Sequence, residues 1–133
     1  MEYRINFINN SFRRFAKTHK EELIGAFWDC LERGALILRE EVSRLEDNIA
    51  KFVGTKYAIG VNSGTDALLL SLKSIGIKQG NEVITTPFTF ISPAEMIAQC
   101  GAKPVFVDIN YDDFLINPDL IEKAITKNTK AIL

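Results

Sequence analysis

The fold of this chain is decided by residues 56–68, which have the sequence KYAIGVNSGTDAL. Residues 57–61 are a short run of apolar and β-branched side chains, so they predict a strand. A polar turn containing glycine follows, and residues 65–75 are predicted to form a helix. A strand that passes through a glycine-containing turn into a helix is the first half of a βαβ unit.

The segments after residue 75 repeat this alternation at intervals of roughly 20 to 25 residues. Further strands are predicted at residues 82–86, 104–109 and 130–133, and further helices at residues 93–100 and 118–126. The chain is therefore predicted to be α/β, a three-layer αβα arrangement around a mostly parallel sheet. Two helix starts carry clear signals: Ser92-Pro93-Ala94-Glu95 is a capping box with proline at the first helical position, and Asn117-Pro118 repeats the cap and the proline.

Two amphipathic helices are predicted before residue 55. Apolar side chains recur at three-to-four spacing over residues 20–33, where Gly34 supplies a left-handed stop, and again over residues 42–52, where the pattern ends at Gly54. The last four residues, 130–133, are typical of a strand just beginning. The sequence is therefore expected to be truncated, split or incomplete.

Composition indicates one soluble globular unit. The chain has 133 residues, 47% of them hydrophobic, and a formal net charge of −1 from 16 basic and 17 acidic side chains. Because these charges are interspersed, no surface suited to nucleic acid is expected. No stretch approaches the roughly 18 apolar residues of a membrane span. Cys30 and Cys100 lack the spacing of a metal site or disulfide framework, so a reduced, cytoplasmic location is expected.

Residues 62–66 are the candidate binding motif. Free N–H groups and the positive end of the dipole at a helix start attract anions, and Gly64 permits close approach of the backbone. Ser63 and Thr65 add hydroxyl donors, so the motif suits a phosphate. The same residues also suit a plain turn and helix N-cap, and spacing alone favours that interpretation. Asp66 must point away from a phosphate or meet a cation, because its carboxylate repels anions.

Four motifs follow one another along the chain: residues 56–68, 80–90 (GNEVITTPFTF), 101–109 (GAKPVFVDI) and 121–132. In order and spacing they resemble the DegT/DnrJ/EryC1/StrS family of pyridoxal-phosphate-dependent sugar aminotransferases. The resemblance implies the fold-type-I aminotransferase architecture, with a large αβα domain, a smaller carboxy-terminal domain and a homodimer whose active sites lie at the subunit interface. Residues 1–54 would then be an N-terminal helical segment, and residues 55–133 the first part of the cofactor-binding large domain, truncated.

The resemblance also implies cofactor contacts. By motif position, Gly64 and Thr65 would contact the phosphate of pyridoxal 5'-phosphate, with Ser63 close by, and Phe90 would stack on its pyridine ring. Such stacking contributes roughly 0.5–1.5 kcal/mol beyond area burial. Without the resemblance Phe90 would be assigned to the core, because the turn after a buried strand commonly packs aromatic residues. Phe88 is the nearby competitor.

No catalytic residue is assigned in this chain. Transamination needs a lysine that binds the cofactor covalently and an acid that keeps the pyridine nitrogen protonated, and the family's motifs for both follow the region covered here. Lys73, Lys78 and Lys103 are interpreted as solvated side chains at helix ends or turns. The aspartates in residues 108–113 are interpreted as part of a solvated loop, and no metal site is predicted.

These assignments predict an enzyme that moves an amino group from an amino acid, such as glutamate, to a nucleotide-linked keto-sugar. This chain alone is expected to be inactive, because it lacks the lysine. Two alternatives stay open. One is a related cofactor-dependent sugar dehydratase, with histidine at the lysine position, and the other is a non-catalytic or split fragment that needs a downstream segment.

Overall fold

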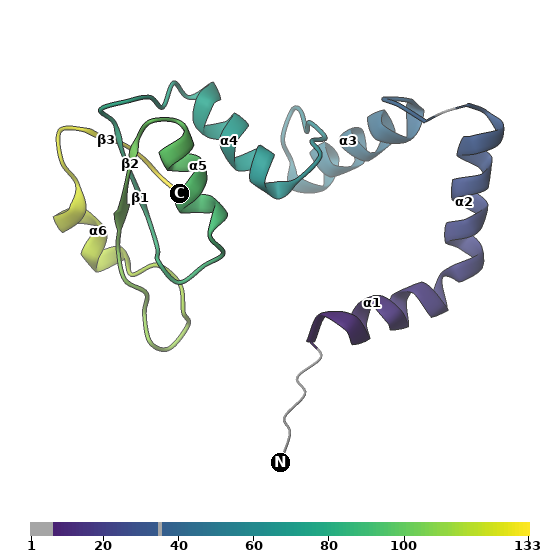
Figure 1. Cartoon of the computed structure of the whole chain (residues 1–133), viewed down its shortest axis with the longest axis horizontal. Coiled ribbons are helices and arrows are strands. Elements are labelled where there is room, and N and C mark those ends of the chain that lie inside the picture. The colour runs from purple at the N-terminus through teal and green to yellow at the C-terminus, as the bar shows by residue number, and fades with distance from the viewer. Residues whose placement is uncertain (1–6, 35) are drawn as a thin grey trace, which may run out of the picture. The chain divides into compact units, whose positions relative to one another are not determined.

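The structure, a computed structural model, describes residues 7–34 and 36–133. The chain divides into two compact units, Met1–Gly60 and Val61–Leu133. The first unit is helical and the second is α/β (Figure 1). No helix in the described part of the chain is long and apolar enough to cross a lipid bilayer.

The first unit contains the helices α1 (Phe7–Thr18), α2 (Lys20–Glu32) and α3 (Glu40–Val53). The helices predicted at residues 20–33 and 42–52 are confirmed as α2 and α3. Each is followed by the predicted glycine in left-handed conformation, with φ of 63° at Gly34 and 79° at Gly54. Helix α1 was not predicted, because its asparagine and serine residues have weak helix preferences.

One arginine joins the end of α2 to the start of α3. Arg33 Nη2 donates to Asp29 Oδ2 at 2.8 Å and to Glu41 Oε1 at 2.5 Å. The hydrogen bond from Arg33 holds the pKa of the Glu41 carboxyl below its ordinary value. Because these groups are solvent-accessible, the contact contributes little to stability, and its main effect is to fix the connection between the two helices.

The strand predicted at residues 57–61 is not formed. The Gly60 N–H donates to Glu46 Oε1 at 2.7 Å, so a side chain of α3 occupies a backbone group that a strand would use for pairing. Apolar and β-branched composition marks a segment that suits a sheet, but a ladder also needs a neighbouring backbone. Within the described residues this segment has no such neighbour.

The second unit alternates helices and strands: α4 (Gly64–Ser74), β1 (Glu82–Thr85), α5 (Ser92–Gln99), β2 (Lys103–Phe106), α6 (Pro118–Ala124) and β3 (Thr129–Ile132). The strands form one parallel sheet in the order β2-β1-β3. The predicted α/β class and the strands at 82–86, 104–109 and 130–133 are therefore confirmed, although the second strand ends at Phe106. Its last hydrogen bond to β1 runs from the Val107 N–H to Thr85 O at 2.9 Å.

Helices cover both sides of this sheet. The connection from β1 to β2 moves in one direction across the sheet, and the connection from β2 to β3 moves back past β1. Because such crossovers are right-handed, the two directions place α5 and α6 on opposite faces. Figure 1 shows this arrangement, with β1 between the two helices. Helix α4 packs beside α5.

The core of the second unit is built around β1. Val83 and Ile84 are both 0% exposed, and because successive strand residues point to opposite faces, they occupy the two sides of the sheet. Val83 packs with side chains of α4, α5 and the connecting turns; these are Leu72, Ile77, Met96, Ile97 and Ala102. A strand of four residues is thus buried on both faces, which is typical of a central parallel strand.

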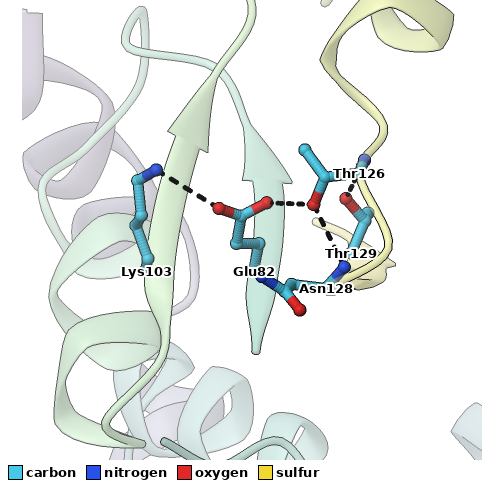
Figure 2. Close-up of polar contacts among 5 residues, drawn as sticks. All are labelled: Glu82, Lys103, Thr126, Asn128 and Thr129. Atoms are coloured by element: carbon cyan, nitrogen blue, oxygen red, sulfur yellow. Dashed lines mark hydrogen bonds and ion pairs between the residues drawn. The ribbon is translucent and has the colours of Figure 1, made fainter. Parts of the chain in front are cut away.

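A largely buried carboxylate joins the amino ends of the three strands (Figure 2). Glu82 of β1 accepts hydrogen bonds from Lys103 Nζ of β2 at 3.2 Å and from Thr126 Oγ1, which precedes β3, at 2.5 Å. Thr126 Oγ1 accepts from the Asn128 N–H at 3.1 Å. The hydrogen bond from Thr126, and to a smaller extent the one from Lys103, holds the pKa of Glu82 below its ordinary value of 4.5. We call these four residues the Glu82 clamp.

The two predicted helix caps have different outcomes. Asn117 caps α6, because its Oδ1 accepts from the Asp119 N–H at 2.9 Å. Ser92 was expected to cap α5, and this was wrong: Ser92 is the first residue of the helix, and no side chain caps it. The Ser92 hydroxyl instead bonds to Thr65 of α4. Its partner lies in another helix, so the local sequence gave no sign of it.

Replacing Glu82 with glutamine tests the Glu82 clamp. The folded-state pKa is depressed, so the charge stabilises the fold above the unfolded-state pKa, and this stabilisation is lost as the pH falls through the folded-state value. In urea unfolding, Glu82→Gln should lower the midpoint at about pH 7, and the gap to wild type should close as the pH approaches about 3. Glu122→Gln, on exposed α6, is the control and should follow wild type. A gap that does not change with pH would contradict the clamp.

Truncation of Ile97 tests the core. Ile97 is fully buried between α5 and the sheet, so Ile97→Ala should lower the free energy of unfolding by about 2–5 kcal/mol. Ile75, next to α4 but 63% exposed, gives the matched control, and Ile75→Ala should change it by less than about 0.5 kcal/mol. Chemical unfolding followed by circular dichroism measures both. Similar losses in the two variants would show that the core is placed wrongly.

Candidate functional site

The candidate site lies at the carboxyl edge of the sheet. Helix α4 precedes β1 in the chain and helix α5 follows it. Both helices therefore begin at the end of the sheet where the strands finish. A hydrogen bond of 2.9 Å between Thr65 Oγ1 and Ser92 Oγ joins the two helix starts directly. In parallel sheets ligands bind at this edge, because helix N-termini and loops converge there.

Ser63 caps α4 and also bonds the side chain of Asp66. Ser63 Oγ accepts from the Asp66 N–H at 3.1 Å and donates to Asp66 Oδ2 at 3.1 Å. The acidic side chain is thus turned back onto the capping serine, which accounts for a carboxylate in the first turn of a candidate anion site. Because the Ser63 hydroxyl is engaged in the cap, Gly64 and Thr65 carry the remaining donors.

Those donors suit an anion. The N–H groups of Gly64 and Thr65 have no acceptor among the described residues, as expected for the first turn of a helix. A Cβ built at Gly64 would meet no atom within 4 Å, so the space beside this backbone is open. The Thr65 and Ser92 hydroxyls together carry two protons, and one of these protons forms the hydrogen bond between them. The other proton is available to a further acceptor.

The segment between β1 and α5 carries the two aromatic candidates. Phe90 is 75% exposed and stacks on no other ring within the described residues. Phe88 instead stacks on Phe114, with ring centroids 5.7 Å apart. One aromatic side chain is thus engaged in the protein, and the other is available for contact. Phe90 lies two residues before Ser92, on the segment that reaches the start of α4.

The loop after β2 holds Phe114 in place. The Asn110 N–H donates to Leu115 O at 2.8 Å and the Phe114 N–H donates to Asn110 O at 3.1 Å. Phe114 has a φ of 59°, a left-handed conformation that is uncommon for a side chain of this size. Asp113 Oδ1 accepts from the Leu115 N–H at 2.9 Å and so stabilises the turn. Among the described residues no cluster of acidic, histidine or cysteine side chains could hold a metal ion.

The three lysines considered from the sequence lie away from this edge. Lys73 is in the last turn of α4, and Lys78 lies in the connection to the amino end of β1. Lys103 pairs with Glu82 in the clamp at the opposite edge of the sheet (Figure 2). All three side chains are exposed. None of them belongs to the group formed by the starts of α4 and α5.

Two residues of the site were missed by sequence reasoning. Ser92 was assigned to a local cap, and nothing in the sequence connects it with Thr65, 27 positions earlier. Phe114 was not considered at all, because a left-handed turn residue is normally sought among glycine and asparagine. A phenylalanine at this position indicates an unusual turn only once its φ angle is known.

Comparison with known proteins agrees with the fold. Residues 17–133 match the DegT/DnrJ/EryC1/StrS aminotransferase family. The UDP-2-acetamido-2-deoxy-3-oxo-D-glucuronate aminotransferase of Pseudomonas aeruginosa is 45% identical over 114 residues, covering 86% of this chain and 32% of that protein. Among solved structures, S. venezuelae DesV in complex with a ketimine intermediate is similar with a TM-score of 0.87 at 36% identity, over 90% of this chain and 32% of that one.

A second similar solved structure is that of a PLP form. The putative sugar aminotransferase Spr1654 from Streptococcus pneumoniae, in its PLP form, matches with a TM-score of 0.78 at 35% identity, over 82% of this chain and 28% of that chain. The present chain thus spans less than a third of the length of each of these relatives. The similarity concerns the region that contains α2 to β3.

A double-mutant cycle tests the contact between Phe88 and Phe114. Phe88→Ala and Phe114→Ala should each destabilise the chain, and their effects should be non-additive by about 0.5–1.5 kcal/mol, the contribution of a stacked aromatic pair. The measurement is the free energy of unfolding. Pairing Phe88→Ala with Tyr111→Ala, where Tyr111 is highly exposed on the same loop, should give additive effects. Additivity in the first cycle would exclude the stacked pair.

Proposed function

Because the chain belongs to the DegT/DnrJ/EryC1/StrS aminotransferase family, we propose that it forms the first part of the cofactor-binding domain of a pyridoxal-phosphate-dependent sugar aminotransferase. The proposed reaction transfers an amino group from an amino acid to a nucleotide-linked keto-sugar. Relatives of this chain carry such names, including the UDP-sugar aminotransferase of Pseudomonas aeruginosa. The proposed assembly is a homodimer of the complete protein.

The observation that supports this proposal best is the anion cradle at the start of α4. Its donors are the N–H groups of Gly64 and Thr65 and the spare proton of the Thr65–Ser92 hydroxyl pair. A phosphate has several acceptor oxygens and a negative charge, so it matches both the donors and the helix dipole. The open space beside Gly64 leaves room for it. The residues present therefore fit the phosphate of the cofactor.

Phe90 is the proposed contact for the cofactor ring. Its ring is solvent-exposed, and Phe88 is engaged with Phe114, so Phe90 is the aromatic side chain of this segment that is free to stack. A flat aromatic surface positions a conjugated ring and leaves the polar edges of that ring accessible. When bound, the cofactor supplies an electron-withdrawing ring that activates the amino group for transfer, and this chain supplies binding and orientation.

The lysine that binds the cofactor covalently is proposed to come from a segment other than the one described here. Lys73, Lys78 and Lys103 lie toward the amino edge of the sheet, whereas the cradle lies at its carboxyl edge. The chain by itself is therefore proposed to bind the phosphate and ring without completing the reaction. The amino-acid donor and the sugar are proposed to meet the cofactor in the complete protein.

Phe90→Ala tests the ring contact. In the full-length protein it should weaken binding of pyridoxal 5'-phosphate by about 2- to 13-fold, the equivalent of the roughly 0.5–1.5 kcal/mol of aromatic stacking. Equilibrium dialysis with pyridoxal 5'-phosphate measures this constant, and thermal unfolding shows whether the fold is retained. Phe88→Ala is the matched control, because it should lower stability and leave the affinity of the folded protein near wild type. Equal affinity of wild type and Phe90→Ala would refute the stacking contact.

A further inference from the structure

Ser92 has an unusual position for a helix-start serine. The residue is 5% exposed, it is the first residue of α5, and its hydroxyl does not cap that helix. The hydroxyl instead contacts Thr65 Oγ1, in the first turn of the neighbouring helix, at 2.9 Å. A buried hydroxyl needs a hydrogen-bond partner, and within the described residues Thr65 is the one that Ser92 has.

Burial sets the direction of this hydrogen bond. Ser92 is 5% exposed, so its hydroxyl proton has little access to water, and in the described part of the chain its hydrogen-bond partner is Thr65 Oγ1. Leaving that proton unpaired would cost more than the bond gains, so Ser92 donates and Thr65 accepts. The Thr65 proton is then released for another acceptor. Thr65 follows Gly64 at the open start of α4, where the unpaired backbone donors lie.

We propose that Ser92 is a positioning residue for the phosphate cradle. By donating to Thr65 Oγ1 it fixes the rotamer of that side chain, so that the Thr65 proton is directed to a phosphate oxygen together with the N–H groups of Gly64 and Thr65. This inference rests on the proposed function, because it assigns Ser92 to the same cradle. Preorganised donors bind more tightly, since no side-chain freedom is lost when the ligand arrives.

The hydroxyl pair also links two parts of the site. Ser92 follows the segment that carries Phe90, and Thr65 belongs to the cradle, so one hydrogen bond connects the ring contact with the phosphate contact. The packing of α4 against α5 holds the two helix starts together around it. Ser92 itself is buried and does not need to touch the cofactor. Its effect passes through the Thr65 hydroxyl.

Binding of pyridoxal 5'-phosphate and of phosphate-free pyridoxal by the full-length protein tests this role. Ser92→Ala should weaken binding of the phosphorylated ligand by about 2- to 13-fold, the range expected for one lost hydrogen bond, and should leave pyridoxal binding unchanged. In a Thr65→Val background the same change should have no further effect on the affinity for pyridoxal 5'-phosphate, because the hydroxyl that Ser92 positions is absent. Ser74→Ala, on the exposed end of α4, is the control and should bind both ligands like wild type.

The outcomes separate the two proposals. If wild type binds the phosphorylated ligand no better than pyridoxal, the phosphate cradle itself is wrong, and with it the role of Ser92. If wild type shows the preference and Ser92→Ala keeps it, or loses affinity for both ligands equally, Ser92 has a structural role only and the inference is overturned. Ser92→Cys keeps a similar side-chain volume and a weak donor, so it replaces the alanine variant if that variant does not fold. A loss of affinity for pyridoxal 5'-phosphate between those of wild type and of a variant without the donor supports the inference.

Discussion

The second unit depends on the burial of one strand of four residues. Because β1 lies between β2 and β3 and beneath helices on both faces, Val83 and Ile84 remove apolar surface from water on either side of the sheet. The same strand also carries the contacts at the amino and carboxyl ends of the sheet. At its amino end Glu82 holds the neighbouring strands, and at its carboxyl end the chain turns toward the start of α5 and the cradle.

The two ends of β1 use polar groups in opposite ways. At the amino end a carboxylate is satisfied within the protein, by a hydroxyl and an ammonium group. At the carboxyl end donors are left without protein acceptors among the described residues, at Gly64 and Thr65. Satisfied polar groups hold a structure, whereas donors left open and preorganised bind ligands. The second arrangement is the one on which the proposed cofactor site rests.

Sequence patterns predicted the parts of this structure whose causes are local. The strand at β1, the glycine stops after α2 and α3, and the Asn117 cap all follow from neighbouring residues. The strand expected at residues 57–61 failed because pairing depends on another backbone, which composition does not reveal. At the site, the Ser63 cap and the position of Gly64 were predictable from the turn motif. The Ser92–Thr65 bond and the ring of Phe114 were not, because both depend on tertiary contacts.

The Glu82 clamp carries a consequence for the order of folding. Its contact with Lys103 spans 21 residues, whereas its contact with Thr126 spans 44. Doubling the length of a closed loop costs about 0.6 kcal/mol more in chain entropy, so the β1-α5-β2 unit, a parallel βαβ unit, is expected to close more readily than β3 returns to the sheet. Strand β3 is therefore expected to join the sheet last. The start of α5 belongs to this early unit, and α4 packs against α5, so the carboxyl edge is expected to form with it.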